Sequence, residues 1–160
     1  MRKAEEIVPV RTDKPVPDTE VMRLLKLRGT VRQFKSDPIP DSWVRALIEA
    51  AQRAPTSSNL QSYSIIAVRN AEIKAKLAEL GGNQQHIIDC PVFFALCADM
   101  ARPSYVCKLH GKNYPARYLE AGLVASIDAS LAAPAILLEL SVTRIRSSPL
   151  LTHSFTPLPV

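Results

Sequence analysis

The sequence predicts a single domain of mixed α-helices and β-strands. Three observations support this prediction. A chain of 160 residues with 47% hydrophobic side chains can fill one core. Segments in which apolar residues recur with helical spacing alternate with two short segments rich in β-branched and aromatic residues. Proline and glycine lie at the ends of most of these segments, as they do between short secondary-structure elements.

The chain opens with residues 1–17, which mix charged side chains with three prolines and are expected to form an extended arm. Helical spacing of apolar residues begins after this arm. Asp18 or Thr19 is placed to cap the first helix, and Gly29 is placed to end it. The sequence therefore predicts a short amphipathic helix and a folded domain that begins at residue 18.

A second helix is predicted after the proline-marked turn "SDPIPDSW". Asp41 or Ser42 can cap this helix, and Pro55 is expected to end it. The polar loop that follows leads into residues 63–69, which are apolar and β-branched. This segment predicts a buried strand.

A third helix and a second strand complete the central part of the chain. Asn70 can cap the helix, and the glycines at 81 and 82 can end it. Residues 91–99 form a continuous apolar run of the kind found in a central strand covered on both faces. A loop with two prolines and a glycine is expected after this strand.

A long helix is predicted over residues 116–133, where many small residues stand between larger apolar ones. Small residues permit close packing, so this helix is expected to be central in the fold or to lie at a subunit interface. Pro134 is expected to break it. Residues 134–160 lack glycine and a clear period, and we interpret them as a divergent tail after the domain of residues 18–133.

Composition argues against several classes of protein. No run of eighteen apolar residues and no apolar N-terminal signal region occurs, so a cytoplasmic protein that spans no membrane is expected. Three cysteines without a C-x-x-C pair favour reduced thiols, and the scattered histidines lack the spacing of metal ligands. The net charge of +5 is spread along the chain, which argues against nucleic acid as a partner and leaves room for a small anionic ligand.

The stretch "RGTVRQF" has the chemistry of an anion-binding segment. Arg28 and Arg32 carry guanidinium groups beside a predicted helix end, and Thr30 adds a hydroxyl. Gly29 can let backbone N–H groups approach a phosphate closely. The alternative is that both arginines are solvated side chains that flank a turn.

The stretch "APTSSNLQ" offers hydroxyl and amide groups that both donate and accept hydrogen bonds. Such groups could match the edge of a heterocycle that also presents donors and acceptors. An ordinary polar loop after a proline is the alternative.

Taken together and in this order, the two stretches resemble the opening of the FMN-dependent nitroreductase family. The segments "DPIP", "LIEAAQRAPTSSNLQSYSIIAV", "GGNQQHI", "PVFFALCAD" and "VASIDASLAA" extend the likeness over roughly residues 18–133. They look like the branch of NADPH-linked nitroreductases and flavin reductases. The resemblance implies an α+β fold, a three-layer α/β/α sandwich, and an intertwined homodimer with FMN at the subunit interface.

The resemblance also implies roles for particular residues. Arg28, Gly29 and Thr30 would hold the FMN phosphate, and Arg32 would lie by the ribityl chain or the pyrimidine edge. Pro55, Thr56, Ser57 and Asn59 would line the flavin ring from the partner subunit, with Gln61 close by. Gln84 would meet the ring or the ribityl group.

The implied reaction is a ping-pong transfer of hydride from NAD(P)H, through flavin N5, to a nitroaromatic, quinone or flavin acceptor. No catalytic side chain is expected, because the flavin carries the chemistry. After residue 133 the family's glycine-rich segment, further strands and basic pair cannot be matched, so the C-terminal part is expected to be missing or replaced. Two alternatives are a catalytically impaired family remnant with weak or no FMN binding, and a small basic non-flavin binding module.

Overall fold

The computed structural model describes residues 18–114 and 119–142. The predicted arm of residues 1–17 and most of the predicted tail lie outside these residues. The described elements follow one another in chain order. They are α1 (Glu20–Leu27), α2 (Asp41–Ala51), the 3₁₀ turn η1 (Ser57–Asn59), β1 (Tyr63–Val68), α3 (Ala71–Leu80), α4 (Gln85–Asp89), β2 (Phe93–Ala98), α5 (Ala101–Leu109) and α6 (Leu119–Val142).

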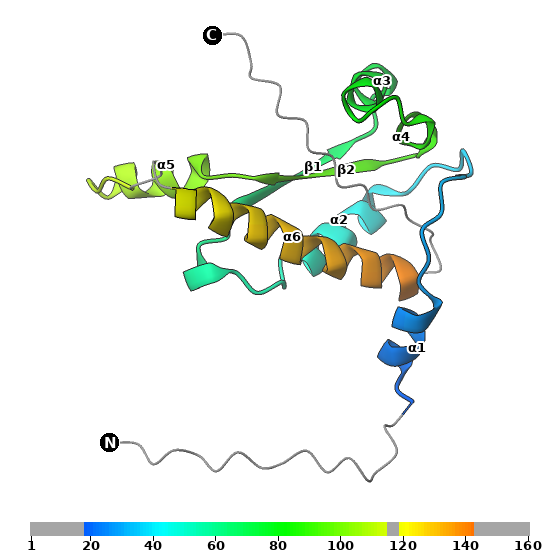
Figure 1. The fold of residues 1–160 in the computed structure, drawn as a ribbon, viewed down its shortest axis with the longest axis horizontal. Helices are drawn as coiled ribbons and strands as arrows, with labels where there is room; N and C mark the ends of the chain where they lie inside the picture. The colour runs from blue at the N-terminus through cyan, green and yellow to red at the C-terminus, as the bar shows by residue number, and fades with distance from the viewer. Residues whose placement is uncertain (1–17, 115–118, 143–160) are drawn as a thin grey trace.

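The described strands form one antiparallel pair, and helices pack against it. β1 and β2 run from the pair Tyr63 and Ala98 to the pair Val68 and Phe93. α6 lies across this sheet with α2 beside it, while α3 and α4 lie together at one end of the strands and α5 at the other (Figure 1). The predicted mixture of helices and strands, an α+β fold, is therefore confirmed.

The core lies between α2, the sheet and α6. Its buried members are Leu47, Ala51, Tyr63, Ala129, Ala132, Ile136 and Leu140. The α6 residues at the centre of this cluster are alanines, which let the helix approach its neighbours closely. This confirms the prediction that the small residues of the long helix serve close packing.

Two predicted helix caps are confirmed, and a third is corrected. The Thr19 hydroxyl accepts a hydrogen bond from the Met22 N–H (3.3 Å), and the Asn70 side chain accepts one from the Ile73 N–H (3.0 Å). Asp41 and Ser42 do not cap α2, because the cap position is Pro40 and the helix begins at Asp41. The Asp41 carboxylate instead pairs with Arg69 at 2.5 Å.

Two helix ends and one helix remain to be compared with the prediction. α1 ends at Leu27 with Arg28 as its C-cap, so Gly29 directly follows the cap as predicted, although without a positive φ, and α2 ends at Ala51, before Pro55. The loop expected after the second strand contains α5, in which Pro103 occupies the first turn. Proline is tolerated there because the N–H groups of a first turn have no partner within the helix.

The predicted break at Pro134 is wrong. α6 continues through this exposed proline to Val142, and the segment beyond it still buries Ile136 and Leu140 in the core. A proline in a helix costs one backbone hydrogen bond, to the carbonyl four residues earlier. Burial of two large apolar side chains on the next turns offsets this cost. The division of the chain at residue 133 stays a prediction, but the helix does not end there.

The strands are less buried than expected. Every residue of β2 is at least partly exposed, and Ile66 of β1 is 53% exposed. Within residues 18–114 and 119–142 the sheet has two strands, so β2 is not a central strand covered on both sides. The continuous apolar run therefore correctly predicted a strand but not its place in the sheet.

Candidate functional site

The polar loop between α2 and β1 has an unusual backbone. Ser58, Asn59 and Gln61 have φ values of 49°, 55° and 51°, in the left-handed region that residues other than glycine rarely adopt. Asparagine tolerates this region, whereas serine and glutamine occupy it at a cost of roughly 1 kcal/mol or more each. The surrounding structure must therefore hold the loop in this form.

A carboxylate of α6 holds both ends of this loop. Asp128 Oδ1 accepts a hydrogen bond from the Ser57 N–H (2.9 Å), and Oδ2 accepts one from the Ser62 N–H (3.1 Å). Within the loop the Thr56 hydroxyl accepts a weaker bond from the Gln61 N–H (3.4 Å). Sequence reasoning missed Asp128, although a lone aspartate in the apolar stretch "VASIDASLAA" is a signal, because a buried charge requires partners.

The loop presents its polar side chains outward. Ser57, Asn59 and Gln61 are exposed, and so is Pro55, while Thr56 is half-buried. Because the backbone N–H groups at the two ends are satisfied internally, the hydroxyl and amide side chains between them remain available to a ligand. The structure therefore brings five of the predicted site residues together in one loop.

The predicted anion-binding segment is also exposed. Arg28, Gly29, Thr30 and Arg32 are all on the surface. Among the described residues neither guanidinium forms a salt bridge with a carboxylate. A Cβ added to Gly29 would meet nothing within 4 Å, so the protomer itself does not require a glycine there. The segment thus offers two uncompensated positive charges to an anion.

One protomer does not bring these two half-sites together. The segment after α1 lies near the C-terminal end of α6, whereas the teal loop that carries η1 lies by the first half of α6 (Figure 1). The hydrogen bonds to Asp128 place this loop there as well. A site built from both half-sites would therefore need a second copy of the chain.

Gln84 lies apart from both half-sites, in the turn between α3 and α4. Its backbone N–H donates to the Ala78 carbonyl (3.2 Å), and its side-chain Nε2 donates to the Gly81 carbonyl (2.8 Å). The side chain is half-buried and turned back onto its own turn. It keeps one N–H and its amide oxygen for another partner.

Lys74 links the two helices on either side of this turn. The residue is buried, with 7% exposure, and its ammonium group donates to the carbonyls of Ile88 (2.8 Å) and Cys90 (2.6 Å), in the last turn and at the C-cap of α4. Burial raises the pKa of the neighbouring Cys90 thiol, and the positive charge of Lys74 opposes this rise. The lysine therefore joins α3 to the end of α4.

Substitution Lys74→Met is expected to lower the free energy of unfolding by about 1.5 to 3 kcal/mol, because two carbonyls lose a charged donor inside the protein. Urea denaturation measures this loss. Lys76→Met on the exposed side of the same helix is the matched control, for which little change is expected. Equal losses in both variants would contradict the assigned role.

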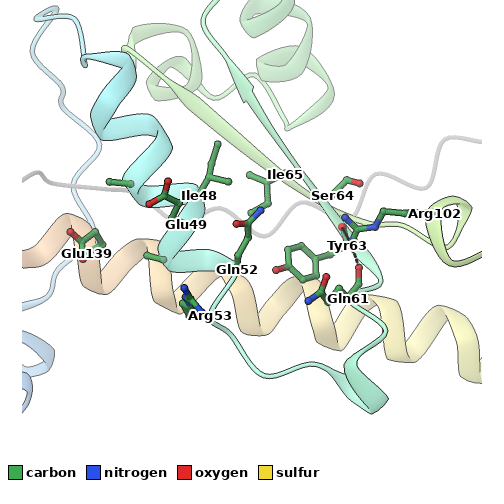
Figure 2. Close-up of a pocket in the computed structure, with 12 residues that line it drawn as sticks. Ile48, Glu49, Gln52, Arg53, Gln61, Tyr63, Ser64, Ile65, Arg102 and Glu139 are labelled. Carbon is green, nitrogen blue, oxygen red and sulfur yellow. Dashed lines mark hydrogen bonds between the residues drawn. The ribbon is translucent and has the colours of Figure 1, made fainter. Parts of the chain in front are cut away.

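An open cleft of about 900 Å³ adjoins the polar loop. Figure 2 shows it between α2, the start of β1 and α6, with Gln61 at its edge and the charged side chains of Glu49, Arg53, Arg102 and Glu139 around it. Arg102 donates to the backbone carbonyls of Gln61 and Tyr63. This arginine therefore supports the polar loop, a role that its position in the sequence did not predict.

The fold is similar to that of known oxidoreductases. NfrA2 of B. megaterium superposes with a TM-score of 0.75 and 31% identity, over 78% of this chain and 51% of that one. An NADPH:FMN oxidoreductase from Vibrio harveyi, solved in complex with NAD⁺, superposes with a TM-score of 0.71 and 26% identity, over 77% and 51% of the two chains. The fold is thus the α+β fold of these proteins.

The sequence comparisons define the family. The model of the nitroreductase family matches residues 25–138, and the chain belongs to this family. An NADPH-dependent oxidoreductase of Staphylococcus saprophyticus is 38% identical over 115 residues, 71% of this chain and 45% of that protein. The FMN reductase [NAD(P)H] of Bacillus subtilis is 36% identical over 115 residues, 71% and 46% of the two chains.

These comparisons also show how far the likeness extends. The chain spans about half the length of the relatives that it matches. The family match continues to residue 138, beyond the predicted limit at 133. This agrees with the unbroken course of α6 through Pro134. The predicted resemblance to the nitroreductase family is therefore confirmed, and the family match ends further along the chain than residue 133.

Proposed function

We propose that this chain forms the flavin-binding part of an FMN-dependent oxidoreductase, which transfers hydride from NAD(P)H to a nitroaromatic, quinone or flavin acceptor in a ping-pong cycle. Family membership and the activities for which the relatives are named support an NAD(P)H-dependent reaction with a flavin. The observation that carries the proposal is the presence of two exposed polar half-sites, one after α1 and one before β1, which lie beside different ends of α6.

The first half-site suits a phosphate. Arg28 and Arg32 supply positive charge and directional N–H donors, and Thr30 supplies a hydroxyl, while Gly29 leaves the backbone open to a close approach. No described carboxylate competes for either guanidinium. These residues would hold the phosphate end of FMN by charge-assisted hydrogen bonds.

The second half-site suits a ring that carries both donors and acceptors. Ser57, Asn59 and Gln61 would bind its edge, with Pro55 and Thr56 beside them. Gln84, which lies apart from this loop in the protomer, would meet the ring or the ribityl group with its free amide oxygen. FMN supplies the hydride chemistry when it is bound, and the protein supplies orientation. A rigid loop serves this purpose, because it keeps the polar groups in place before the ligand arrives.

A homodimer would complete the site. α6 buries its alanines and exposes a row of large apolar residues spaced four apart. These are Leu119, Leu123, Ile127 and Leu131, between 41% and 81% exposed. Such a row is typical of an interface, and a second copy that covered it would bring the phosphate half-site of one protomer toward the polar loop of the other.

α6 also passes a length and composition test for a membrane-spanning helix. Residues 119–140 are long and apolar enough to cross a bilayer by length and composition alone, a test that core helices also pass. α6 packs against α2 and both strands, and it carries the buried carboxylate Asp128. We therefore propose an interface between subunits, and a cytoplasmic protein, rather than a membrane span.

The experiment is a test of flavin uptake. Purified protein is incubated with FMN, passed through a desalting column and examined for flavin absorbance bands, and NADPH consumption is then followed with a quinone or nitroaromatic acceptor. Retained FMN and acceptor-dependent NADPH oxidation are expected. Dimeric protein that retains no FMN would favour the alternative of an impaired family remnant. The family match already argues against a basic binding module unrelated to flavin proteins.

A further inference from the structure

Asp128 is a buried charged residue to which the proposed chemistry gives no role. Its side chain has 0% exposure, at the middle of α6 and between the buried alanines 125 and 129. Among the described residues it forms no salt bridge with a lysine or an arginine. A buried carboxylate without a cation is retained only where hydrogen bonds satisfy it.

The two hydrogen bonds of Asp128 have a particular arrangement. One oxygen receives the N–H of Ser57 (2.9 Å), and the other receives the N–H of Ser62 (3.1 Å). These amides lie at the two ends of a six-residue loop, so a single side chain fixes the distance between its ends. The three left-handed residues lie between them. The loop therefore keeps its strained backbone as long as both ends remain attached.

The effect of this attachment reaches the exposed side chains. Ser57 carries one of the two anchored amides, and Gln61 directly precedes Ser62, which carries the other. Asn59 lies between them. A small rotation of the backbone at either anchor would redirect all three side chains together. The carboxylate lies beneath the loop and does not reach its exposed surface.

We propose that Asp128 is a positioning residue that sets the conformation of residues 57–62 and thereby aligns the polar loop for the flavin. The role in flavin binding rests on the proposed function. The role of Asp128 in fixing the loop conformation does not depend on it. The carboxylate acts through the backbone amides and touches neither cofactor nor substrate.

Asp128→Asn tests the hold on the loop without a cofactor. The amide keeps the size of the side chain, but its oxygen can accept only one of the two N–H groups, and its own NH₂ faces the other. Residue-resolved amide hydrogen exchange is the measurement. At least about tenfold faster exchange is expected at Ser57 or Ser62, because an anchoring bond is lost. Unchanged exchange at both amides would overturn the proposal.

A stability control separates this role from general weakening of the core. Ile136→Ala removes a buried side chain from the same helix, 4% exposed, and leaves both amide bonds to Asp128 intact. It is expected to lower the melting temperature without selectively accelerating exchange at Ser57 and Ser62. The same selective acceleration in this variant would show that the loop follows core stability, and would overturn the proposal.

Ser57→Pro tests the same bond from the donor side if Asp128→Asn fails to fold. Proline removes the N–H that binds Oδ1, and the extended backbone of Thr56 (φ −133°, ψ 153°) is compatible with a following proline. Ser57→Ala is the matched variant, since it removes the hydroxyl and keeps the N–H. Faster exchange at Ser62 is expected in the proline variant alone. Equal exchange in the two variants would overturn the proposal.

FMN titration by fluorescence, with the absorbance spectrum of the bound flavin, tests the consequence for the cofactor. Asp128→Asn is expected to weaken FMN binding at least about tenfold and to shift the flavin spectrum, whereas Ile136→Ala below its melting temperature changes neither. Unchanged affinity with a loosened loop would overturn the flavin role. Failure of the wild-type chain to bind FMN would overturn the proposed function and that role together, and amide exchange would still decide whether Asp128 holds the loop.

Discussion

Substitution Arg28→Ala is expected to weaken FMN binding by about 10- to 150-fold. The guanidinium is exposed at the C-cap of α1 and, among the described residues, has no carboxylate partner, so it is free to bind a phosphate. A hydrogen bond to a charged group contributes about 1.5 to 3 kcal/mol, which corresponds to this loss of affinity. Fluorescence titration with FMN measures it.

The control for this substitution needs an arginine away from both half-sites. Arg102 is unsuitable, because it donates to the carbonyls of Gln61 and Tyr63 and supports the polar loop. Arg45 on the exposed side of α2 is suitable, and Arg45→Ala is expected to leave the affinity near that of the wild type. The FMN affinity of the Arg28→Lys variant should lie between those of the Arg28→Ala and Arg45→Ala variants, since lysine keeps the charge but loses the planar fork of donors. Equal affinities of the Arg28→Ala and Arg45→Ala variants would refute the phosphate assignment.

The double substitution Leu123→Glu and Ile127→Glu is expected to convert the proposed dimer into monomers and to abolish FMN retention. Both side chains lie on the outer face of α6, 55% and 56% exposed in the protomer. Full burial of one such side chain contributes about 1.5 to 3 kcal/mol, and each protomer would instead place two carboxylates in the interface. Light scattering after gel filtration measures the mass, and absorbance measures the bound flavin.

The matched control for the dimer is Ile73→Glu. Ile73 is 50% exposed on α3, a helix that lies at the end of the strands rather than on the outer face of α6 (Figure 1). This variant is expected to keep the mass and flavin content of the wild type. If the double variant on α6 also kept the dimeric mass, the proposed interface would be wrong.

Much of the fold follows from short stretches of sequence. Thr19 and Asn70 were predicted as caps because their side chains reach N–H groups three residues ahead, and the structure shows both bonds. Strands were predicted over 63–69 and 91–99 from β-branched and apolar runs, and the structure has them at 63–68 and 93–98. α5 escaped prediction because a proline within its first turn resembles a loop signal.

The candidate site, like the fold, could be predicted from the sequence only in part. Hydroxyl, amide and guanidinium groups in two short stretches identified both half-sites, and the order of these stretches led to the family that the comparisons confirm. Their assignment to the parts of FMN stays a prediction. Asp128 and Arg102 were not predicted as site residues, since they lie 66 and 41 positions from the loop residues Ser62 and Gln61 that they bind.

By itself, the sequence determined the approximate positions of most helices and of both strands, and two of the helix caps, because these properties depend on neighbours a few positions apart. The tertiary structure decided which face of α6 is buried. In the first half of the helix alanines face the core, since α2 and the sheet approach the helix closely, and the row Leu119, Leu123, Ile127 and Leu131 remains outside. It also decided that α6 continues through Pro134, because core contacts of Ile136 and Leu140 outweigh one lost backbone bond.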